Sequence, residues 1–504
     1  MDITEDAFIR LQEIRFYGVT VYDQQELLGL YEKLVGQEIH ISELYGIANH
    51  LTARYHRDGY LLSQAFVPQQ TITDGKVQIW VTEGAIKSFH ITGSEYDSSG
   101  MLEKYIQRIM ESSPLHKSVL ERNLLLINDL PGITAQSYII PGKNGLQDAE
   151  LVLNIAYRKL AGYVGADNRG SKFFGRDQLY ASVELNNVLG LGERIELTPT
   201  MSGVVDQESI GGSINTMIPI HANGTYLQIY VAGSETKPGG FLSPYELEGE
   251  ALFGSLAVGY PLIREANKYL YLTGELDYVK AEEDIYKDEA FIKDAQTALR
   301  AGLVFHQAGA FNGDTYAELK VSFGVDGLGT RDADHPLSSR ENADNSFVKL
   351  QTSATRRQSL AMLAENLNLV IGLEGQYSAN PLPSSEEYGL GGAIFLRGYD
   401  NYELSGDDAI ASRVELQYDH KAVQIQPLYA LESFVFYDYG KIWNRSPLDF
   451  EEDNRSIASA GLGVRANLTR RTFASFYLAK PLTKDVISNR DDNLRYFLQL
   501  AMSF

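Results

Sequence analysis

The part of the chain from residue 160 to residue 504 alternates between apolar and polar side chains in one short segment after another. In the run 316–325, one face carries Ala317, Leu319, Val321, Phe323 and Val325, and the other carries Glu318, Lys320 and Ser322. A repeat of two residues is typical of a β-strand whose two faces meet different surroundings. Because no helical periodicity interrupts these segments, the sequence predicts one large structure of about sixteen antiparallel strands.

A closed transmembrane barrel explains these strands better than soluble β-sandwiches do. Single-chain bacterial barrels have an even number of strands, and each strand crosses the membrane with only about 9–11 residues. Sandwiches would need domain boundaries within these roughly 340 residues, and none is visible. Charges on one side of nearly every strand fit a water-filled lumen, with apolar residues facing lipid. The final residue, Phe504, ends an alternating strand, as is typical of outer-membrane barrels.

The composition agrees with a barrel and excludes several other classes of protein. The 504 residues include 45 glycines, 31 tyrosines and 21 phenylalanines, as expected for many turns and aromatic girdles. A net charge of −22 argues against nucleic-acid binding, which needs a basic surface to neutralise phosphates. Cysteine is absent, and the nine histidines show no metal-ligand spacing. We therefore expect no metal or other cofactor.

Residues 8–158 read as two copies of one small α+β unit. In the first copy we expect a strand over 8–17, helices over 23–35 and from the N-cap Ser42 to Asp58, and strands over 62–68 and 76–82. The second helix carries Leu44, Ile47, Ala48, Leu51 and Tyr55 on one face. The second copy has a strand over 86–91, helices over 101–110 and 115–130, and strands over 134–140 and 149–157. A repeat at about 75 residues indicates duplicated β-α-α-β-β domains, and two unrelated α+β domains are the alternative.

An arginine stands near the tip of a long Gly- and Pro-rich loop between two of the predicted barrel strands. The tip reads Phe395-Leu396-Arg397-Gly398-Tyr399-Asp400. If this loop folds into the lumen, Arg397 needs an anionic partner. On the first strand after the loop, Glu415 belongs to the lumen-facing set. On the second strand, Asp438 shares the inward-facing set with Glu432, Phe434 and Phe436. Strand parity therefore predicts a contact between Arg397 and Asp438.

Such a contact would be strong and directional, because a guanidinium can bind a carboxylate with two hydrogen bonds. Gly398 permits a tight backbone, and Tyr399 can pack against the wall while its hydroxyl finds a partner. The alternative is an exposed arginine without a fixed partner, since most surface charges pair weakly.

These features together resemble the outer-membrane transporters of two-partner secretion. The resemblance covers FLRGYD at 395–400, FYDYG at 436–440, the two leading repeats and the C-terminal barrel. The family includes haemolysin-activator, filamentous-haemagglutinin and contact-dependent-inhibition transporters, and residues 51–84 are especially similar to its first POTRA domain. The resemblance implies a first POTRA domain over 1–84, a second over 85–158, and a transmembrane β-barrel over 159–504 with an inward-folded loop 381–407.

The resemblance also implies roles for residues and partners. Arg397, Gly398 and Tyr399 would be the tip of the inward loop, and Asp438 and Gly440 would belong to the wall motif that receives it. The partner would be one large secreted β-helical exoprotein, bound unfolded. The barrel would lie in the lipid of a Gram-negative outer membrane as a monomer, with the POTRA domains in the periplasm. Because no Ser/His/Asp constellation is present, we predict a transporter rather than an enzyme.

The N-terminus departs from the family pattern. Family members usually carry a plug helix before the first POTRA domain, whereas only residues 1–7 precede the first predicted strand. These residues also lack the basic and apolar regions of a signal peptide. We therefore expect a mature form without its signal peptide, and a plug that is absent or removed. Two alternative functions remain, a barrel-assembly or insertase protein and a passive porin; two repeats favour secretion, because insertases tend to carry more.

Overall fold

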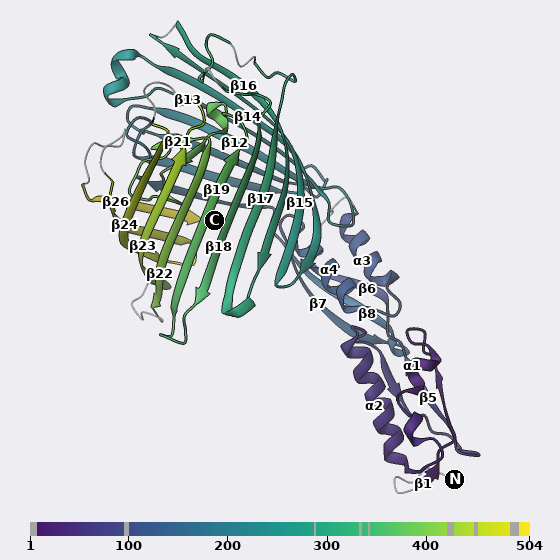
Figure 1. Ribbon diagram of the computed structural model, residues 1–504. Helices are drawn as coiled ribbons and strands as arrows, with labels where there is room; N and C mark the ends of the chain where they lie inside the picture. Colours follow the sequence, from purple (N-terminus) through teal and green to yellow (C-terminus); the bar gives the residue numbers. More distant parts are fainter. Residues whose placement is uncertain are drawn as a thin grey trace. The chain divides into compact units, whose positions relative to one another are not determined.

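The computed structural model describes residues 8–94, 100–286, 289–331, 335–340, 343–420, 428–447, 452–483 and 493–504. The chain divides into two compact units, Met1–Arg158 and Lys159–Phe504 (Figure 1). The expectations about a removed signal peptide and a missing plug helix concern residues 1–7, which lie outside the described residues.

The first half of the N-terminal unit is a three-stranded sheet with one long helix packed on it. Its elements are β1 (Phe8–Arg10), β2 (Glu13–Tyr17), α1 (Gln24–Leu28), the 3-10 turn η1 (Glu32–Leu34), β3 (Glu38–His40), α2 (Ile41–Arg57), β4 (Gln64–Phe66) and β5 (Lys76–Thr82). Strand β5 is central, with β2 parallel on one side and β4 antiparallel on the other. The predicted strand over 8–17 is wrong as one element, because Leu11 turns into the core and separates β1 from β2.

Helix α2 covers the sheet with the predicted apolar face. Leu44, Ile47, Ala48, Leu51 and Tyr55 are all buried. Its start differs from the prediction, because the N-cap is His40 and not Ser42. The Nδ1 atom of His40 accepts from the Ser42 N–H, and the Glu43 carboxylate accepts from the His40 N–H at 3.3 Å, which forms a capping box. The predicted helix over 23–35 is a short α-helix followed by a 3-10 turn.

The second half of this unit repeats the same strand order. Its elements are β6 (Ile86–Gly93), α3 (Met101–Glu111), α4 (Lys117–Asn128), β7 (Ile133–Gly142) and β8 (Gly145–Tyr157). Strand β8 is central, with β6 parallel to it and β7 antiparallel. In the three-stranded sheet of each half, the strand before the helices (β2 or β6) is parallel to the last strand (β5 or β8), and the remaining strand (β4 or β7) is antiparallel to it. The repeat in the sequence is therefore also a repeat in the topology of these two sheets.

The C-terminal unit is a closed barrel of sixteen antiparallel strands, as predicted (Figure 1). The strands are β9 (Leu160–Asp167), β10 (Gln178–Asn186), β11 (Arg194–Ser202), β12 (Ser209–Pro219), β13 (Tyr226–Thr236), β14 (Glu248–Glu265), β15 (Lys268–Ile285), β16 (Glu289–Gln307), β17 (Gly313–Val325), β18 (Val348–Ser359), β19 (Leu367–Ser378), β22 (Asp408–His420), β23 (Ala430–Trp443), β24 (Asn454–Asn467), β25 (Thr472–Pro481) and β26 (Arg495–Ser503). Strand β26 pairs with β9 and closes the barrel. Strands β14, β15 and β16 have 18, 18 and 19 residues and are much longer than β9 with eight.

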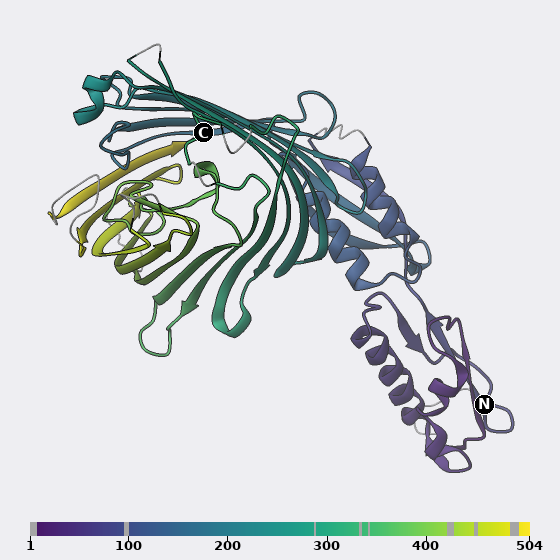
Figure 2. The same ribbon diagram turned by 45° about the horizontal axis from the view of Figure 1, so that its top comes forward.

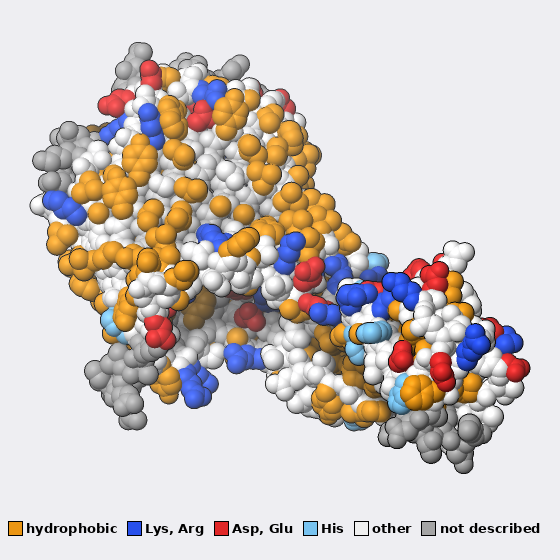
Figure 3. All heavy atoms as spheres, turned by 60° about the horizontal axis from the view of Figure 1, so that its bottom comes forward, with side chains coloured by type: hydrophobic (Ala, Val, Ile, Leu, Met, Phe, Trp, Pro, Cys, Tyr) orange, Lys and Arg blue, Asp and Glu red, His pale blue; other side chains and the backbone are white. Residues whose placement is uncertain are grey.

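The two faces of the barrel wall differ in polarity. Figure 3 shows apolar side chains spread over the outer surface of the barrel, and exposed leucines such as Leu319, Leu373 and Leu462 belong to it. Inward-facing positions carry polar and charged side chains that are largely buried, including Asp277, Lys349 and Gln376. This is the pattern of a barrel with lipid outside and a polar lumen. No helix in the described part of the chain is long and apolar enough to span a membrane.

The segment between β19 and β22 folds back into the barrel. Figure 2 looks into the lumen and shows this green segment inside the ring of strands. It contains the 3-10 turn η4 (Ser384–Glu386) and a small hairpin of β20 (Tyr388–Leu390) and β21 (Leu404–Gly406), which the sequence did not predict. The antiparallel order places its entry at the end of the barrel where β9 finishes, which we call the far end. We call this segment the inward loop.

Candidate functional site

The tip of the inward loop is a tight turn that presents Arg397 and Gly398 to the barrel wall. The N–H of Tyr399 donates to the Leu396 carbonyl at 2.9 Å, so Arg397 and Gly398 are the two central residues of the turn. Leu396 has a φ of 61°, a backbone conformation that is uncommon for a residue with a side chain. Since Leu396 is also completely buried, the surrounding packing holds this conformation in place.

The guanidinium of Arg397 meets two buried carboxylates on the wall. Its Nε lies 3.0 Å from Asp438 Oδ2 and its Nη2 lies 2.9 Å from Asp438 Oδ1, while the Arg397 backbone N–H also donates to Oδ2 at 3.0 Å. Its Nη1 donates to Glu415 on β22. The guanidinium carbon lies 3.7 Å from the centre of the Phe436 ring, so the charge also rests on an aromatic face. Arg397 is 4% exposed and Asp438 is 0% exposed.

A second arginine extends this charge cluster along the wall. Arg465 Nη1 on β24 lies 2.7 Å from Glu415 and 2.5 Å from Glu432, and its guanidinium stacks 3.8 Å from the Phe434 ring. Glu415 therefore receives two arginines, one from the loop and one from the wall. The sequence placed Glu415 on the lumen face but did not identify it as a partner of Arg397. Alternation along the strand shows which face Glu415 lies on, but it does not show how close Glu415 lies to the loop tip.

Gly398 and Tyr399 fit the wall closely. The N–H of Gly398 donates to Ser459 Oγ at 3.3 Å, and a Cβ atom at Gly398 would lie 2.8 Å from Ser459 Cβ. The hydroxyl of Tyr399 donates to the Ala458 carbonyl at 2.9 Å and accepts from the Thr483 N–H at 3.0 Å. The loop tip thus contacts the ends of β24 and β25 as well as β22 and β23.

An apolar cluster surrounds the charged contacts. It consists of Leu390, Phe395, Leu396, Tyr399 and Leu404 from the loop with Ala409, Ala411, Ile442 and Ile457 from the wall. Gly440 on β23 lies beneath it, and a Cβ there would lie 2.7 Å from methyl groups of both Leu390 and Leu396. A glycine at this position lets two loop leucines sit directly on the strand.

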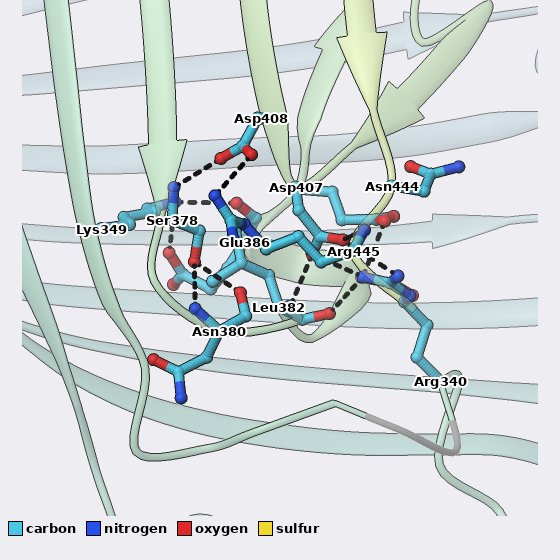
Figure 4. A network of polar contacts seen from close by, with 12 residues as sticks. Arg340, Lys349, Ser378, Asn380, Leu382, Glu386, Asp407, Asp408, Asn444 and Arg445 are labelled. Carbon is cyan, nitrogen blue, oxygen red and sulfur yellow. Dashed lines mark hydrogen bonds and ion pairs between the residues drawn. The ribbon is translucent and has the colours of Figure 1, made fainter. Parts of the chain in front are cut away.

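The far-end root of the inward loop is held by a separate polar network (Figure 4). Asp407 Oδ1 accepts from Arg340 Nη1 at 2.8 Å and from the Leu382 N–H at 2.6 Å. Its Oδ2 accepts from Arg340 Nη2 at 3.2 Å and from the Arg445 N–H at 2.8 Å. Asp407 is completely buried, and its donors come from three loops of the far end.

Glu386 forms the other half of this network. Its carboxylate accepts from Lys349 Nζ at 2.6 Å on β18 and from Arg300 Nη2 at 2.7 Å on β16. Arg300 also binds Asp277 on β15 at 2.6 Å, and Gln376 Nε2 donates to the Glu386 carbonyl at 3.1 Å. The sequence did not predict this anchor, because its partners lie 10 to 86 residues away and share no motif.

Comparison with known proteins identifies the family. A sequence model described as "Haemolysin secretion/activation protein ShlB/FhaC/HecB" matches residues 151–466, more than half of the chain. The chain belongs to this family. A second model, described as "POTRA domain, ShlB-type", matches residues 9–84. The predicted family and the predicted location in the outer membrane, with the POTRA module on its periplasmic side, are thereby confirmed.

Individual relatives span most of the chain. The heme/hemopexin transporter protein HuxB of Haemophilus influenzae is 24% identical over 502 residues, which cover 95% of this chain and 84% of HuxB. The outer membrane transporter CdiB of Escherichia coli O6:K15:H31 is 24% identical over 429 residues, which cover 82% and 70%. Among solved structures, CdiB from Escherichia coli shows the same fold, with a TM-score of 0.78 at 20% identity over 99% of this chain and 91% of that chain.

The family match decides between the functions that the fold alone left open. A barrel with polar lumen and periplasmic domains is compatible with a porin or an insertase. Membership of the secretion/activation family makes this chain an outer-membrane translocator of two-partner secretion. In the part of the chain that the structure describes, no group of His, Asp or Glu side chains could hold a metal ion.

Proposed function

We propose that this translocator secretes one large exoprotein of β-helical fold, which reaches it unfolded and is recognised by its POTRA domains. It works as a monomer and without an enzymatic step of its own. The periplasm is not expected to supply ATP, so folding of the client outside the cell gives the direction of transport. Support comes from the family, and from the polar lumen lined by inward-facing charged residues.

Within this function, Arg397, Gly398, Tyr399, Asp438 and Gly440 act as a latch that fixes the inward loop in the lumen. The observation that carries the proposal is the bidentate contact between Arg397 and Asp438, with both side chains almost completely removed from water. A buried carboxylate that loses its counter-charge is strongly disfavoured, so the loop has one preferred position. The latch therefore shapes the path that a client takes through the barrel.

Client binding occurs by strand addition to the outer edge of β7 in the second POTRA domain. The backbone groups of Ala135 on this edge are occupied by the Asn128 side chain, at 2.8 Å and 3.3 Å. The same edge continues through Ser137 and Ile139, whose outward N–H and C=O groups meet no partner among the described residues. The corresponding edge of the first domain is occupied, because Thr52 Oγ1 of α2 accepts from the Ala65 N–H at 2.8 Å. A free edge of this kind accepts an extended peptide with little sequence demand.

Secretion in a Gram-negative host tests the function. The chain is co-expressed with a candidate large exoprotein, and the exoprotein is measured in the medium. Ser137→Pro removes the outward N–H without breaking a bond to β8, and Ser137→Ala is the matched control that keeps it. We expect secretion by the wild type and by Ser137→Ala, and reduced secretion by Ser137→Pro. Steady ion conductance without any secretion would instead support the porin function.

A further inference from the structure

The pairing that closes the barrel, between β26 and β9, has fewer residue pairs than any other pairing between described barrel strands. It runs from Tyr163 opposite Ser503 to Asp167 opposite Gln499, which is five residue pairs. On either side, β9 pairs with β10 over eight residues and β25 pairs with β26 over eight residues. We call the β26–β9 closure the seam. Its backbone pairing ends before the first residues of β26 at the far end are reached.

A side chain continues the seam where backbone pairing stops. Asn168 follows β9, and its Oδ1 accepts from the Leu498 N–H at 2.7 Å while its Nδ2 donates to the Tyr496 carbonyl at 3.1 Å. The Asn168 backbone N–H donates to the Leu498 carbonyl at 3.3 Å. The far-end part of the seam is thus joined through a side-chain amide in place of a second strand.

Beyond Asn168, the seam is bridged by a residue of the inward loop. Asp400, which directly follows Tyr399 at the loop tip, is 4% exposed. Its Oδ1 lies 3.0 Å from Arg495 Nη1 on β26 and 3.6 Å from Arg176 Nη1, which precedes β10. Its Oδ2 accepts from the Lys172 N–H at 2.9 Å, in the segment between β9 and β10. One carboxylate therefore collects donors from both sides of the seam.

We propose that Asp400 is a positioning residue that holds the far-end part of the seam closed as long as the inward loop occupies the lumen. Two guanidinium groups, from Arg495 on one side and Arg176 on the other, converge on the same oxygen atom. When the loop leaves, the carboxylate that joins them leaves with it, and two like charges remain on opposite sides. Loop position and seam closure are therefore coupled through this residue, whether or not a client is present.

A pair of spin labels across the seam tests this coupling in the full chain, without any client. The protein has no cysteine, so introduced cysteines are labelled selectively. Cysteines at Ala166 and Leu498 report on the far-end part of the seam, because Leu498 binds Asn168 beyond the paired residues and lies two residues from Leu500, the register partner of Ala166. Cysteines at Leu303 and Leu319, register partners on β16 and β17, are the reference. Dipolar broadening of the electron paramagnetic resonance spectrum measures each separation.

In Asp400→Ala we expect a loss of broadening at the seam pair and unchanged broadening at the reference pair. Asp400→Asn keeps an acceptor for the Lys172 N–H but removes the charge, so its loss should be smaller. If Asp400→Ala does not fold, Arg495→Gln removes the β26 donor and leaves the loop sequence intact, with the same expected loss. Unchanged broadening at the seam, or equal loss at both pairs, would overturn the proposal. Secretion is not measured, so this outcome is separate from the test of client transport.

Discussion

The charge cluster at the loop tip predicts that substitutions of Arg397 and Asp438 destabilise the barrel to different extents. Arg397→Gln removes the cation that serves both Asp438 and Glu415, whereas Asp438→Asn removes only one of the two anions that serve Arg397. Each substitution removes one charge; Asp438→Asn keeps the side-chain shape, whereas Arg397→Gln also shortens the side chain and removes every guanidinium contact. We therefore expect Arg397→Gln to destabilise the barrel more than Asp438→Asn.

The burial of the pair sets the size of the two effects. Removing one partner of a buried ion pair costs about 3–5 kcal/mol, because the remaining charge has no compensation. Asp438, at 0% exposure, is in that position after Arg397→Gln. After Asp438→Asn, the arginine keeps Glu415, so the expected cost is that of lost charged hydrogen bonds, about 1.5–3 kcal/mol. The double variant should cost less than the sum of the single variants by about 0.5–3 kcal/mol, since the two residues are in direct contact.

Equilibrium unfolding by guanidinium chloride in lipid vesicles measures these free energies. The chain has two tryptophans, and Trp443 on β23 reports on the barrel once Trp80 on β5 is replaced by phenylalanine. Equal effects of the two single variants would contradict the role of Glu415 as a second partner. Strict additivity in the double variant would show that Arg397 and Asp438 do not stabilise each other, and the latch would be refuted.

Three further substitutions or conditions probe other parts of the molecule. Gly398→Ala should lower the free energy of barrel unfolding by about 1–3 kcal/mol, because the added methyl group would crowd Ser459 Cβ; an unchanged unfolding midpoint would contradict this close fit. Glu386→Gln should cost about 3–5 kcal/mol in the same assay, because it leaves buried cations at the loop root without their carboxylate, and a neutral result would argue against that anchor. Burial and the neighbouring Glu83 raise the pKa of Tyr55 above its usual value. As the pH rises, the Tyr55 hydroxyl therefore loses its proton at a lower pH in the unfolded first POTRA domain than in the folded one. Its stability should therefore fall as the pH rises through about 10, and Tyr55→Phe should flatten this dependence in chemical denaturation monitored by tryptophan fluorescence.

The alternation of side chains along the strands was the sequence pattern that predicted most of the candidate site. Alternation along β22 and β23 placed Glu415 and Asp438 on the lumen face, and the structure has both there. Alternation is a local property, so it can be read wherever one face is wet and the other is in lipid. The same reasoning gave the apolar face of α2, because helical periodicity is local as well.

The contacts at the root of the inward loop could not be read in this way. The partners of Asp407 and Glu386 come from loops and strands that the fold alone brings together, and no spacing links them in the sequence. The hairpin of β20 and β21 was missed because each strand has only three residues. The break at Leu11 was missed because one buried residue between two short strands looks like continued alternation.

Strands β14, β15 and β16 are long enough to extend beyond the membrane on one side of the barrel, and their outward side chains show where the membrane ends. On the outward face of β15, Leu272, Leu276 and Tyr278 give way to Lys280, Glu282 and Asp284 within one strand repeat. Lipid tails do not accept such charges, so the change from Tyr278 to Lys280 marks the outer boundary of the hydrocarbon layer.

Neighbouring strands carry the same boundary at the same level. Glu250 on β14 and Lys293 on β16 are register partners of Glu282, and both lie on the outward face. Beyond Tyr278, β15 continues for seven residues to Ile285, about 23 Å at roughly 3.3 Å per residue. This part of the sheet carries charged side chains on its outward face and stands above the lipid as a wall along one side of the pore mouth.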